Sequence, residues 1–371
     1  MPAEKLSMEY AIQTDLAVML RRHLAFERTG AACYRTSPEL AWEQPEPVGC
    51  AEYAPFLEHA PHKPAHQAKA IPHFLAEIEG GSLVKQHRSI FCFDRQQQEL
   101  FCHRTFDPIF AFTRDYWQQQ VQALQAGRTV ELPGRCLLLD SRYGREFYHF
   151  NATVLGRMAR FLSFDQRLAD VDFFLLPEAT STVTAWADIL KIPVEKRVHL
   201  GEHVAVHTGQ LVVPSAAEEF DLATLAFINN ALLQSAAKPE KRLFISRSLS
   251  PNGRQILNEQ DLIDQVLLPR GFEVVHLERL PLRQQAEMLA ASRVIVAAHG
   301  AGLTNLIFCA AGACVLELFS PRWVEFCFAR IASLVGMRSY YHVSQDLPDR
   351  NVAFEPKAFA QVIDAVIDRA G

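Results

Sequence analysis

The sequence predicts an α/β protein whose C-terminal half is organised on a parallel sheet. From Lys241 onward, short apolar segments alternate regularly with segments of helical periodicity. Residues 293–319 show this most clearly, because an apolar strand is followed by the small-residue turn 299–302, a helix and a second apolar strand. The chain has 371 residues, which is the length of two domains. The expected fold is therefore α/β with more than one domain.

The second half alternates five strands with four helices, as a doubly wound sheet with right-handed crossovers requires. Asn258 is a suitable N-cap with Asp261 three residues on, Pro281 suits the first position of a helix, and Gly312 suits a helix end. The expected strands are 242–246, 272–277, 294–296, 314–319 and 340–343. The expected helices are 258–268, 281–292, 303–310 and 323–335.

The first half contains fewer regular signals. The polar stretch 94–99 between two apolar runs suggests a hairpin of 89–93 with 100–103. Further strands are expected at 136–140, 171–176, 198–200 and 205–213. Helices are expected at 7–27, 114–126, 147–162 and 181–190, the last with Ser181 as its N-cap, and within 214–238.

These elements divide the chain into four predicted parts. Residues 1–80 form an irregular extension with one helix, and 81–237 form a first α/β domain. Residues 238–345 form a second, Rossmann-like domain, and the tail 346–371 carries a helix expected to pack back toward the first domain.

Composition excludes several classes of protein. The formal charge is −5 without a long basic block, which argues against nucleic acid as a partner. The eight cysteines include no C-x-x-C pair and are typical of reduced, buried thiols. Neither a signal peptide nor a membrane-spanning run is evident, so we expect a cytoplasmic protein, and peripheral attachment at the inner membrane face is compatible with the sequence.

No metal site is predicted. The histidines of 59–73 match no helix face and lack acidic or cysteine companions, so exposed loop histidines are the expectation. Asp170-Val171-Asp172 has the spacing of a metal-binding Asp-x-Asp, but it precedes a strand where such a motif would follow one. No cofactor is expected.

Polar side chains follow three strands of the second domain. Arg247 and Arg254 come after the first strand, the turn from His299 comes after the third, and Glu317 lies near the end of the fourth. Ligands of open α/β sheets bind beyond the carboxyl ends of the strands, and a glycine-rich helix start with arginines suits a diphosphate. Two alternatives stay open: a purely structural turn, and arginines that are ordinary surface charge.

His149 is the candidate general base in the first domain. It follows a strand-end loop at a helix start, within Tyr148-His149-Phe150, and an imidazole has a suitable pKa for accepting a proton. The alternative is a histidine that only packs against its aromatic neighbours. Glu146 and Asp140 are the next candidates for the same role.

Together these residues resemble glycosyltransferase family 61 over roughly residues 85–345. The resemblance is carried by Ser246-Arg247, Arg254, Asn258-Glu259, Gln285, the run His299-Gly-Ala-Gly-Leu-Thr-Asn305 with Val315 to Leu318, and the Tyr148-His149 pair. The nucleotide-sugar-binding residues it implies are Ser246, Arg247, Arg254, Asn258, His299, Gly300, Ala301, Gly302, Asn305 and Glu317.

The resemblance also implies an architecture and an activity. The architecture is GT-B, with two Rossmann-like domains facing across a cleft. The activity is metal-independent, inverting transfer of a sugar from a nucleotide sugar, commonly UDP-linked, to a glycan or glycolipid hydroxyl in surface polysaccharide biosynthesis. Two alternatives from other classes are an inactive nucleotide-sugar-binding module and an ester hydrolase. The hydrolase is disfavoured because the chain has no Gly-x-Ser-x-Gly elbow.

Overall fold

The structure is a computed structural model, and not every residue of the chain is described by it. It describes residues 33–36, 46–47, 72–86, 88–93, 122, 126, 128–164, 166–215, 219–233, 237–250 and 253–370. The helix expected at 7–27, the strand expected at 100–103 and the histidines at 59, 62 and 66 lie outside this part. Of the helix expected at 114–126, only residues 122 and 126 are described.

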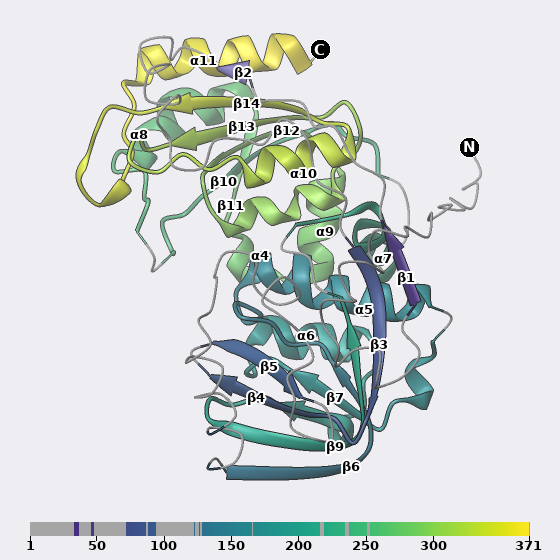
Figure 1. The fold of residues 1–371 in the computed structure, drawn as a ribbon. Coiled ribbons are helices and arrows are strands. Elements are labelled where there is room, and N and C mark those ends of the chain that lie inside the picture. Colours follow the sequence, from purple (N-terminus) through teal and green to yellow (C-terminus); the bar gives the residue numbers. More distant parts are fainter. Residues whose placement is uncertain are drawn as a thin grey trace. The chain divides into compact units, whose positions relative to one another are not determined.

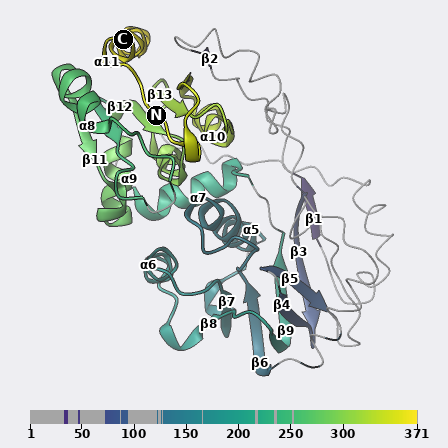
Figure 2. The same cartoon turned by 90° about the vertical axis from the view of Figure 1, so that its left-hand side faces the viewer.

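The chain divides into two compact units (Figures 1 and 2). The first comprises Met1–Glu39 and Lys69–Ile228, and the second comprises Leu40–Ala68 and Asn229–Gly371. Each has its own sheet and its own apolar core. The α/β class expected from the sequence is confirmed in both.

The first unit is built on a mixed sheet. Its described strands are β1 (Cys33–Thr36), β3 (Pro72–Glu79), β4 (Ser82–Gln86), β5 (Ser89–Phe93), β6 (Arg128–Leu138), β7 (Phe173–Leu176), β8 (Arg197–His199) and β9 (Val204–Pro214). Strands β9, β6, β7 and β8 run parallel in that order, while β3 and β4 are antiparallel to β9. Four parallel neighbours thus give this unit one edge where strand ends and helix starts meet.

The helices of the first unit follow its parallel strands. They are α4 (Phe147–His149), which continues through the π-helical turn Phe150–Val154 into α5 (Leu155–Ser163), then α6 (Ser181–Ile189) and α7 (Leu222–Leu232). The boundary between the two units falls within α7, after Ile228. Helix α5 packs against β3 and β9. The predicted helix at 147–162 is confirmed. The N-cap of α6 is Thr180, whose hydroxyl accepts from Val183 N, and not the predicted Ser181.

The second unit is built on a parallel sheet in the order β11-β10-β12-β13-β14-β2. Its strands are β10 (Lys241–Ile245), β11 (Phe272–Val275), β12 (Ser292–Ala298), β13 (Cys314–Phe319), β14 (Arg338–Val343) and the short β2 (Glu46–Pro47). Every pairing is parallel. The alternation predicted from Lys241 onward is therefore confirmed, because buried parallel strands need a covering helix between each pair.

Helices cover both faces of this sheet. One face is covered by α8 (Glu259–Leu262) with its π-helical continuation Ile263–Leu267, and by α11 (Pro356–Ala370), which share a core with β12 and β13. The other face carries α9 (Leu282–Ala290), the 3₁₀ helix Ala301–Phe308 (η10) and α10 (Cys327–Val335). Figure 1 shows α11 on one side of β13 and β14 and α10 on the other. The sheet is doubly wound.

Strand β5 pairs antiparallel with β4, a strand not expected from the sequence. Its predicted partner, 100–103, lies outside the described residues. One expectation about packing differs from the structure. The buried face of α11 packs on the second sheet, whereas the tail helix was expected against the first domain. Its apolar residues repeat at helical spacing, and that pattern predicts a buried face without naming its partner. Among the described residues, no helix is long and apolar enough to cross a bilayer.

Candidate functional site

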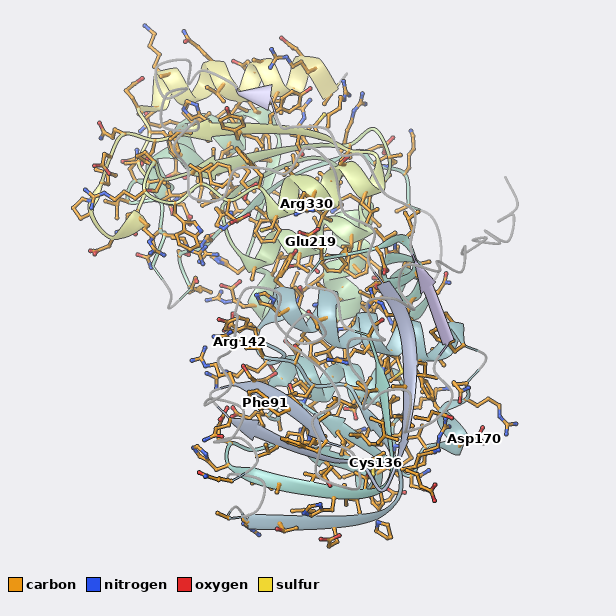
Figure 3. All side chains as sticks on the ribbon, in the orientation of Figure 1. Phe91, Cys136, Arg142, Asp170, Glu219 and Arg330 are labelled. Carbon is orange, nitrogen blue, oxygen red and sulfur yellow. The ribbon has the colours of Figure 1, made fainter. Side chains whose placement is uncertain are left out.

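The candidate site lies beyond the carboxyl ends of the strands in the second sheet. Figure 3 shows the side chains of both units. Strand β10 has β11 on one side and β12 on the other, so the connections after β10 and β12 leave toward opposite sides. Such a switch in strand order opens a crevice where ligands of α/β proteins bind. Ser246 and Arg247 follow β10, and His299 and Gly300 follow β12. The topology therefore brings together the loops that the sequence singled out.

The loop after β10 is tied to the start of α8. Ser246 is buried, and its hydroxyl donates to Glu259 Oε1 at 2.5 Å. The backbone N–H of Arg247 donates to the other carboxylate oxygen of Glu259 at 3.5 Å. The Ser246 hydroxyl also lies 3.0 Å from that of Ser248. Ser246 thus holds the loop in place, which is a supporting role beside the nucleotide contact predicted for it.

The guanidinium of Arg247 is half-buried against Gly300. It donates to Ser250 Oγ at 3.0 Å and to Gly253 O at 3.4 Å, while its Nε is buried without a hydrogen-bond partner among the described residues. A Cβ at position 300 would stand 1.7 Å from Arg247 Nη1, so only glycine leaves room for this side chain. Burial, and then Arg254, lower the pKa of Arg247 to about 10, which leaves it charged at neutral pH.

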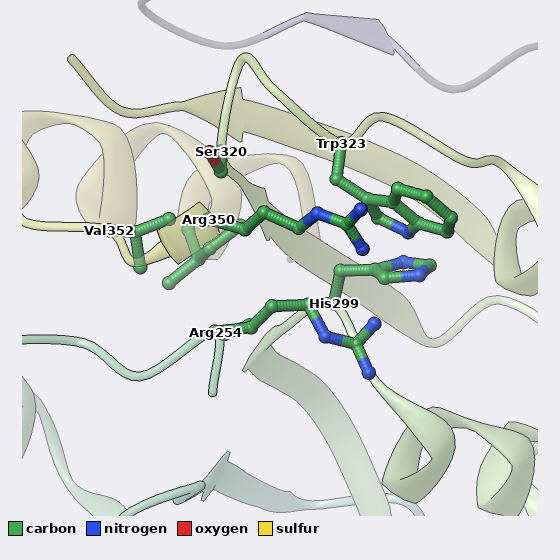
Figure 4. Close-up of a pocket in the computed structure, with 8 residues that line it drawn as sticks. Arg254, His299, Ser320, Trp323, Arg350 and Val352 are labelled. Atoms are coloured by element: carbon green, nitrogen blue, oxygen red, sulfur yellow. The ribbon is translucent and has the colours of Figure 1, made fainter. Parts of the chain in front are cut away.

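A small pocket adjoins this loop, and Figure 4 shows the residues that line it. Arg254 and Arg350 extend side by side into it, with His299 between their ends and Trp323 beside Arg350. Arg350 Cζ lies 4.2 Å from the centroid of the Trp323 ring, within the range of a cation–π interaction. Two arginines, a histidine and an aromatic ring thus share one pocket.

The backbone at both pocket arginines is left-handed. Arg254 has φ 56° and follows Gly253 at φ 67°, and Asp349 and Arg350 both have φ 59°. Side chains other than glycine rarely adopt this conformation, and when they do the surrounding structure must hold them there. Here a parallel bridge joins Ile256 to Val352, two residues beyond each arginine. The bridge holds the two arginine-bearing loops in register.

His299 is buried and hydrogen-bonded to Glu317 through Nδ1, at 2.6 Å from Oε1. Burial, with the charges of Arg254 and Arg247, lowers the pKa of His299 to about 3, so the imidazole is neutral. Burial, with Glu325, raises the pKa of Glu317 well above 4.5, against the lowering effect of Arg254. The carboxyl of Glu317, predicted to bind the nucleotide sugar, is thus engaged with the histidine, and it orients the ring.

The arginines of the site have no carboxylate partner in the described part of the chain. Within those residues, no Asp or Glu oxygen lies within ion-pair distance of Arg247, Arg254 or Arg350. In the same ranges, no group of three or more His, Cys, Asp or Glu residues is placed to hold a metal ion. Unpaired positive charges at a strand-end crevice suit an anion with several negative oxygens, such as a diphosphate.

The remaining predicted residues support the site from within the fold. Asn258 Nδ2 donates to Phe354 O at 2.7 Å, and Phe354 N donates back to Asn258 Oδ1 at 3.3 Å. Asn305 is buried and donates to Gln285 Oε1 and to Gly302 O, both at 3.1 Å. Ala301 and Gly302 open η10, so their N–H groups are at a helix start as expected.

Arg350 and Trp323 were not among the predicted residues. A signal for both was present, because Trp323 follows the end of β13 and Arg350 follows the end of β14. The rule that ligands bind beyond the carboxyl ends of parallel strands therefore points to these two residues as well.

In the first unit, His149 ends α4 within a cluster of aromatic rings. Its ring centroid lies 5.0 Å from that of Tyr143 and 5.2 Å from that of Tyr148, and the side chain is half-buried. Burial lowers the pKa of His149, while Glu146 raises it. A half-exposed imidazole that is neutral at pH 7 can accept a proton from a ligand.

The two other candidate bases differ sharply in their surroundings. Asp140 is fully buried and paired with Lys85 at 2.7 Å, so it holds the core of this unit together. Glu146 is exposed at the start of α4, 3.9 Å from Arg88. Asp170 pairs with Arg167, and Asp172 accepts from Arg135 N, so each of these carboxylates has a partner within the fold.

Comparison with known proteins adds a family to this geometry. The family model Glycosyltransferase 61 matches residues 147–316, from the start of α4 into β13. The EGF domain-specific O-linked N-acetylglucosamine transferase of Drosophila melanogaster is 29% identical over 133 residues, which cover 31% of this chain and 25% of that protein. The chain thus spans about a quarter of the length of this relative.

Among solved structures, the metal-soaked Flv1 flavodiiron core from Synechocystis sp. PCC6803 aligns with 80% of this chain and 63% of that chain. The identity is 10% and the TM-score is 0.23, so the alignment carries no argument about fold or function. The family match spans His149, Arg247, Arg254 and the turn from His299, the residues already placed at the strand ends. The chain therefore carries a glycosyltransferase family 61 domain over residues 147–316.

Proposed function

We propose that this protein is an inverting glycosyltransferase that moves a sugar from a nucleotide sugar to a hydroxyl of a glycan or glycolipid. The observation that carries the proposal is the group of arginines around His299, which lack carboxylate partners among the described residues. Two of them, Arg247 and Arg254, lie within the range that matches glycosyltransferase family 61. The proposed setting is surface polysaccharide biosynthesis in the cytoplasm, with peripheral attachment at the inner membrane face when the acceptor is a glycolipid.

The proposed donor is a UDP-linked sugar. When the bond between the anomeric carbon and the diphosphate breaks, negative charge grows on the leaving phosphate oxygen, and fixed positive groups stabilise that charge. Arg247, Arg254 and the turn from His299 are the groups we assign to this task. The relative named as an N-acetylglucosamine transferase makes N-acetylglucosamine the first sugar to try.

The proposed architecture is GT-B, with the first α/β domain (81–237) supplying the acceptor side and the second (238–345) binding the donor. In this scheme His149 accepts the proton of the acceptor hydroxyl. Support comes from the half-exposed position of His149 and its lowered pKa. The alternative candidate Asp140 is buried and already paired with Lys85.

The first test is a panel of nucleotides and nucleotide sugars measured by calorimetry and by donor turnover, with and without EDTA. We expect UDP to bind without added metal, and one UDP-sugar to be turned over in the presence of a suitable acceptor. Arg247→Ala and Arg254→Ala should each weaken UDP binding by about 1.5–3 kcal/mol, the size of a hydrogen bond to a charged group.

The matched control is Lys241→Ala, at the amino end of the same strand β10, where the lysine forms an exposed ion pair with Glu273. This variant should bind UDP as the wild type does. Loss of binding or turnover with EDTA would contradict the metal-free part of the proposal. Tight binding of UDP-sugars without turnover of any would instead indicate a binding module.

A further inference from the structure

Arg350 is exposed, unlike Arg254 in the same pocket, yet its side chain is held in place. Its guanidinium lies on the face of Trp323 at 4.2 Å, and both side chains line the pocket with Arg254 and His299 (Figure 4). An exposed arginine usually samples many rotamers, and ordering it costs side-chain entropy. The Trp323 ring offsets part of that cost and leaves the N–H edge of the guanidinium available to a ligand.

The fold also brings Arg350 close to Arg254, which carries a charge of the same sign. Two backbone hydrogen bonds join the segments that follow these arginines. Val352 N donates to Gln255 O at 2.9 Å, and Leu257 N donates to Val352 O at 2.8 Å. Asn351 Oδ1 accepts from Gln255 N at 3.0 Å. Arg350 in turn lowers the pKa of Arg254, after the larger effect of burial, as a neighbouring positive charge does. Two like charges held in register are stabilised when an anion occupies the pocket.

We propose that Arg350 is a third phosphate-binding arginine. Its role is to stabilise the additional negative charge that appears on the diphosphate as the sugar leaves. This inference rests on the proposed function. The bond from the anomeric carbon to the phosphate oxygen breaks with its electron pair staying on that oxygen. The acceptor oxygen bonds to the carbon, and its proton passes to the base.

The charge of the ligand rises during this step. A sugar-linked diphosphate carries about two negative charges, whereas the free diphosphate carries about three once its terminal phosphate ionises, with a pKa near 6. The two positive charges of Arg247 and Arg254 balance the two negative charges of the intact donor. Arg350 balances the third negative charge, which appears on the free diphosphate. An interaction that is stronger with the leaving group than with the bound donor accelerates the reaction.

The test compares the affinities of UDP and UDP-N-acetylglucosamine for the wild type, Arg350→Ala and Arg350→Lys, by calorimetry at pH 7.5. Arg350→Ala should weaken UDP binding about tenfold, as expected for one partly exposed charge-assisted hydrogen bond, and weaken UDP-N-acetylglucosamine binding only about threefold. Arg350→Lys keeps the charge and loses the planar fork, so it should fall between the wild type and Arg350→Ala.

Arg322→Ala is the matched control, since Arg322 adjoins Trp323 in sequence but forms an exposed ion pair with Asp346. It should change neither affinity by more than about twofold, because exposed pairs contribute little. Wild-type affinity for both ligands in Arg350→Ala would overturn the inference, and so would an equal loss for both. A wild-type protein that binds neither ligand would refute the proposed function itself.

Discussion

At the scale of single residues, the His299–Glu317 pair combines two large pKa shifts in one buried hydrogen bond. The two side chains are 2.6 Å apart, with Arg254 and Arg247 acting on the histidine and Glu325 on the glutamate. The folded-state pKa of His299 is lowered from 6.5 to about 3, and that of Glu317 is raised well above 4.5, in both cases chiefly by burial. The shift of His299 lowers stability as pH falls, and the shift of Glu317 lowers stability as pH rises.

The pair should give a plateau of stability between pH 4.5 and 6.5. In that range a rise in pH lowers stability through the raised pKa of Glu317 and increases it through the lowered pKa of His299, so the two effects offset each other. Above pH 6.5 only the effect of Glu317 remains, and stability falls as pH rises through its folded pKa. Below pH 4.5 the unfolded state binds the extra proton, and stability falls toward pH 3. Thermal melting from pH 3 to 9 measures this profile.

Glu317→Gln replaces the carboxyl that ionises at high pH with an amide that does not. The variant should therefore keep its stability above pH 6.5 better than the wild type. Glu287→Gln, at an exposed position of α9, is the control and should follow the wild-type profile. If Glu317→Gln and the wild type lose stability in parallel above pH 6.5, the raised pKa of Glu317 is not the cause.

His149 carries a second prediction at this scale. If it is the base, turnover should fall as pH drops through its lowered pKa, because the protonated ring cannot accept a proton. Glu146→Gln removes the charge that raises this pKa, so the acidic limb of the kcat profile should move to lower pH. His149→Gln should lower kcat by about 10²–10⁴ while UDP affinity stays at the wild-type value.

The competing interpretation makes a different prediction. A histidine that only packs between Tyr143 and Tyr148 would, on substitution by glutamine, lower the melting temperature and leave kcat of the folded fraction unchanged. An acidic limb that stays in place in Glu146→Gln would also count against His149 as the titrating group.

At the scale of elements, the turn between β12 and η10 is shaped by what packs against it. Gly300 has an extended backbone, φ 170°, so its need for glycine is not conformational. The reason is Arg247, whose guanidinium occupies the space that a side chain at 300 would fill. Gly302 has looser surroundings, because a Cβ added there would meet Ile245 at 3.5 Å and Leu277 at 3.6 Å, which are ordinary contact distances.

Substitution of these two glycines should therefore have unequal effects. Gly300→Ala should displace Arg247 and weaken UDP binding about as much as Arg247→Ala, with little further loss in the double variant, because both remove the same contact. Gly302→Ala should bind UDP nearly as the wild type does. Calorimetry on the three variants and the double variant checks this. Equal UDP affinity of Gly300→Ala and Gly302→Ala would contradict the packing argument.

At the scale of the whole molecule, each unit has its own core, and α11 belongs to the core of the second. Phe359, Val362, Ile363 and Val366 are buried in one cluster with Val294 and Val296 of β12 and with Leu316 of β13. The last helix of the chain thus completes the face of the sheet opposite α10.

Phe359→Ala should accordingly destabilise the second unit by about 3–5 kcal/mol, the usual loss for a fully buried phenylalanine. Hydrogen exchange locates the effect. Amides of β12 and β13 should lose protection, while amides of β6 and β9 in the first unit should keep theirs. Loss confined to β6 and β9 would show that α11 supports the first unit instead.

The amino-acid sequence was enough to predict the α/β class, the parallel strands after Lys241 and the strand-end positions of Arg247, Arg254 and His299. These features are local, because periodicity reports which face of a segment is buried, and small-residue turns report where strands end. The partners of these residues emerged only from the folded chain: Arg350 beside Arg254, Glu317 on His299, Asn258 on Phe354, and α11 on the second sheet. Those pairs join segments that are distant in the sequence, and they depend on strand order and register, which periodicity does not encode.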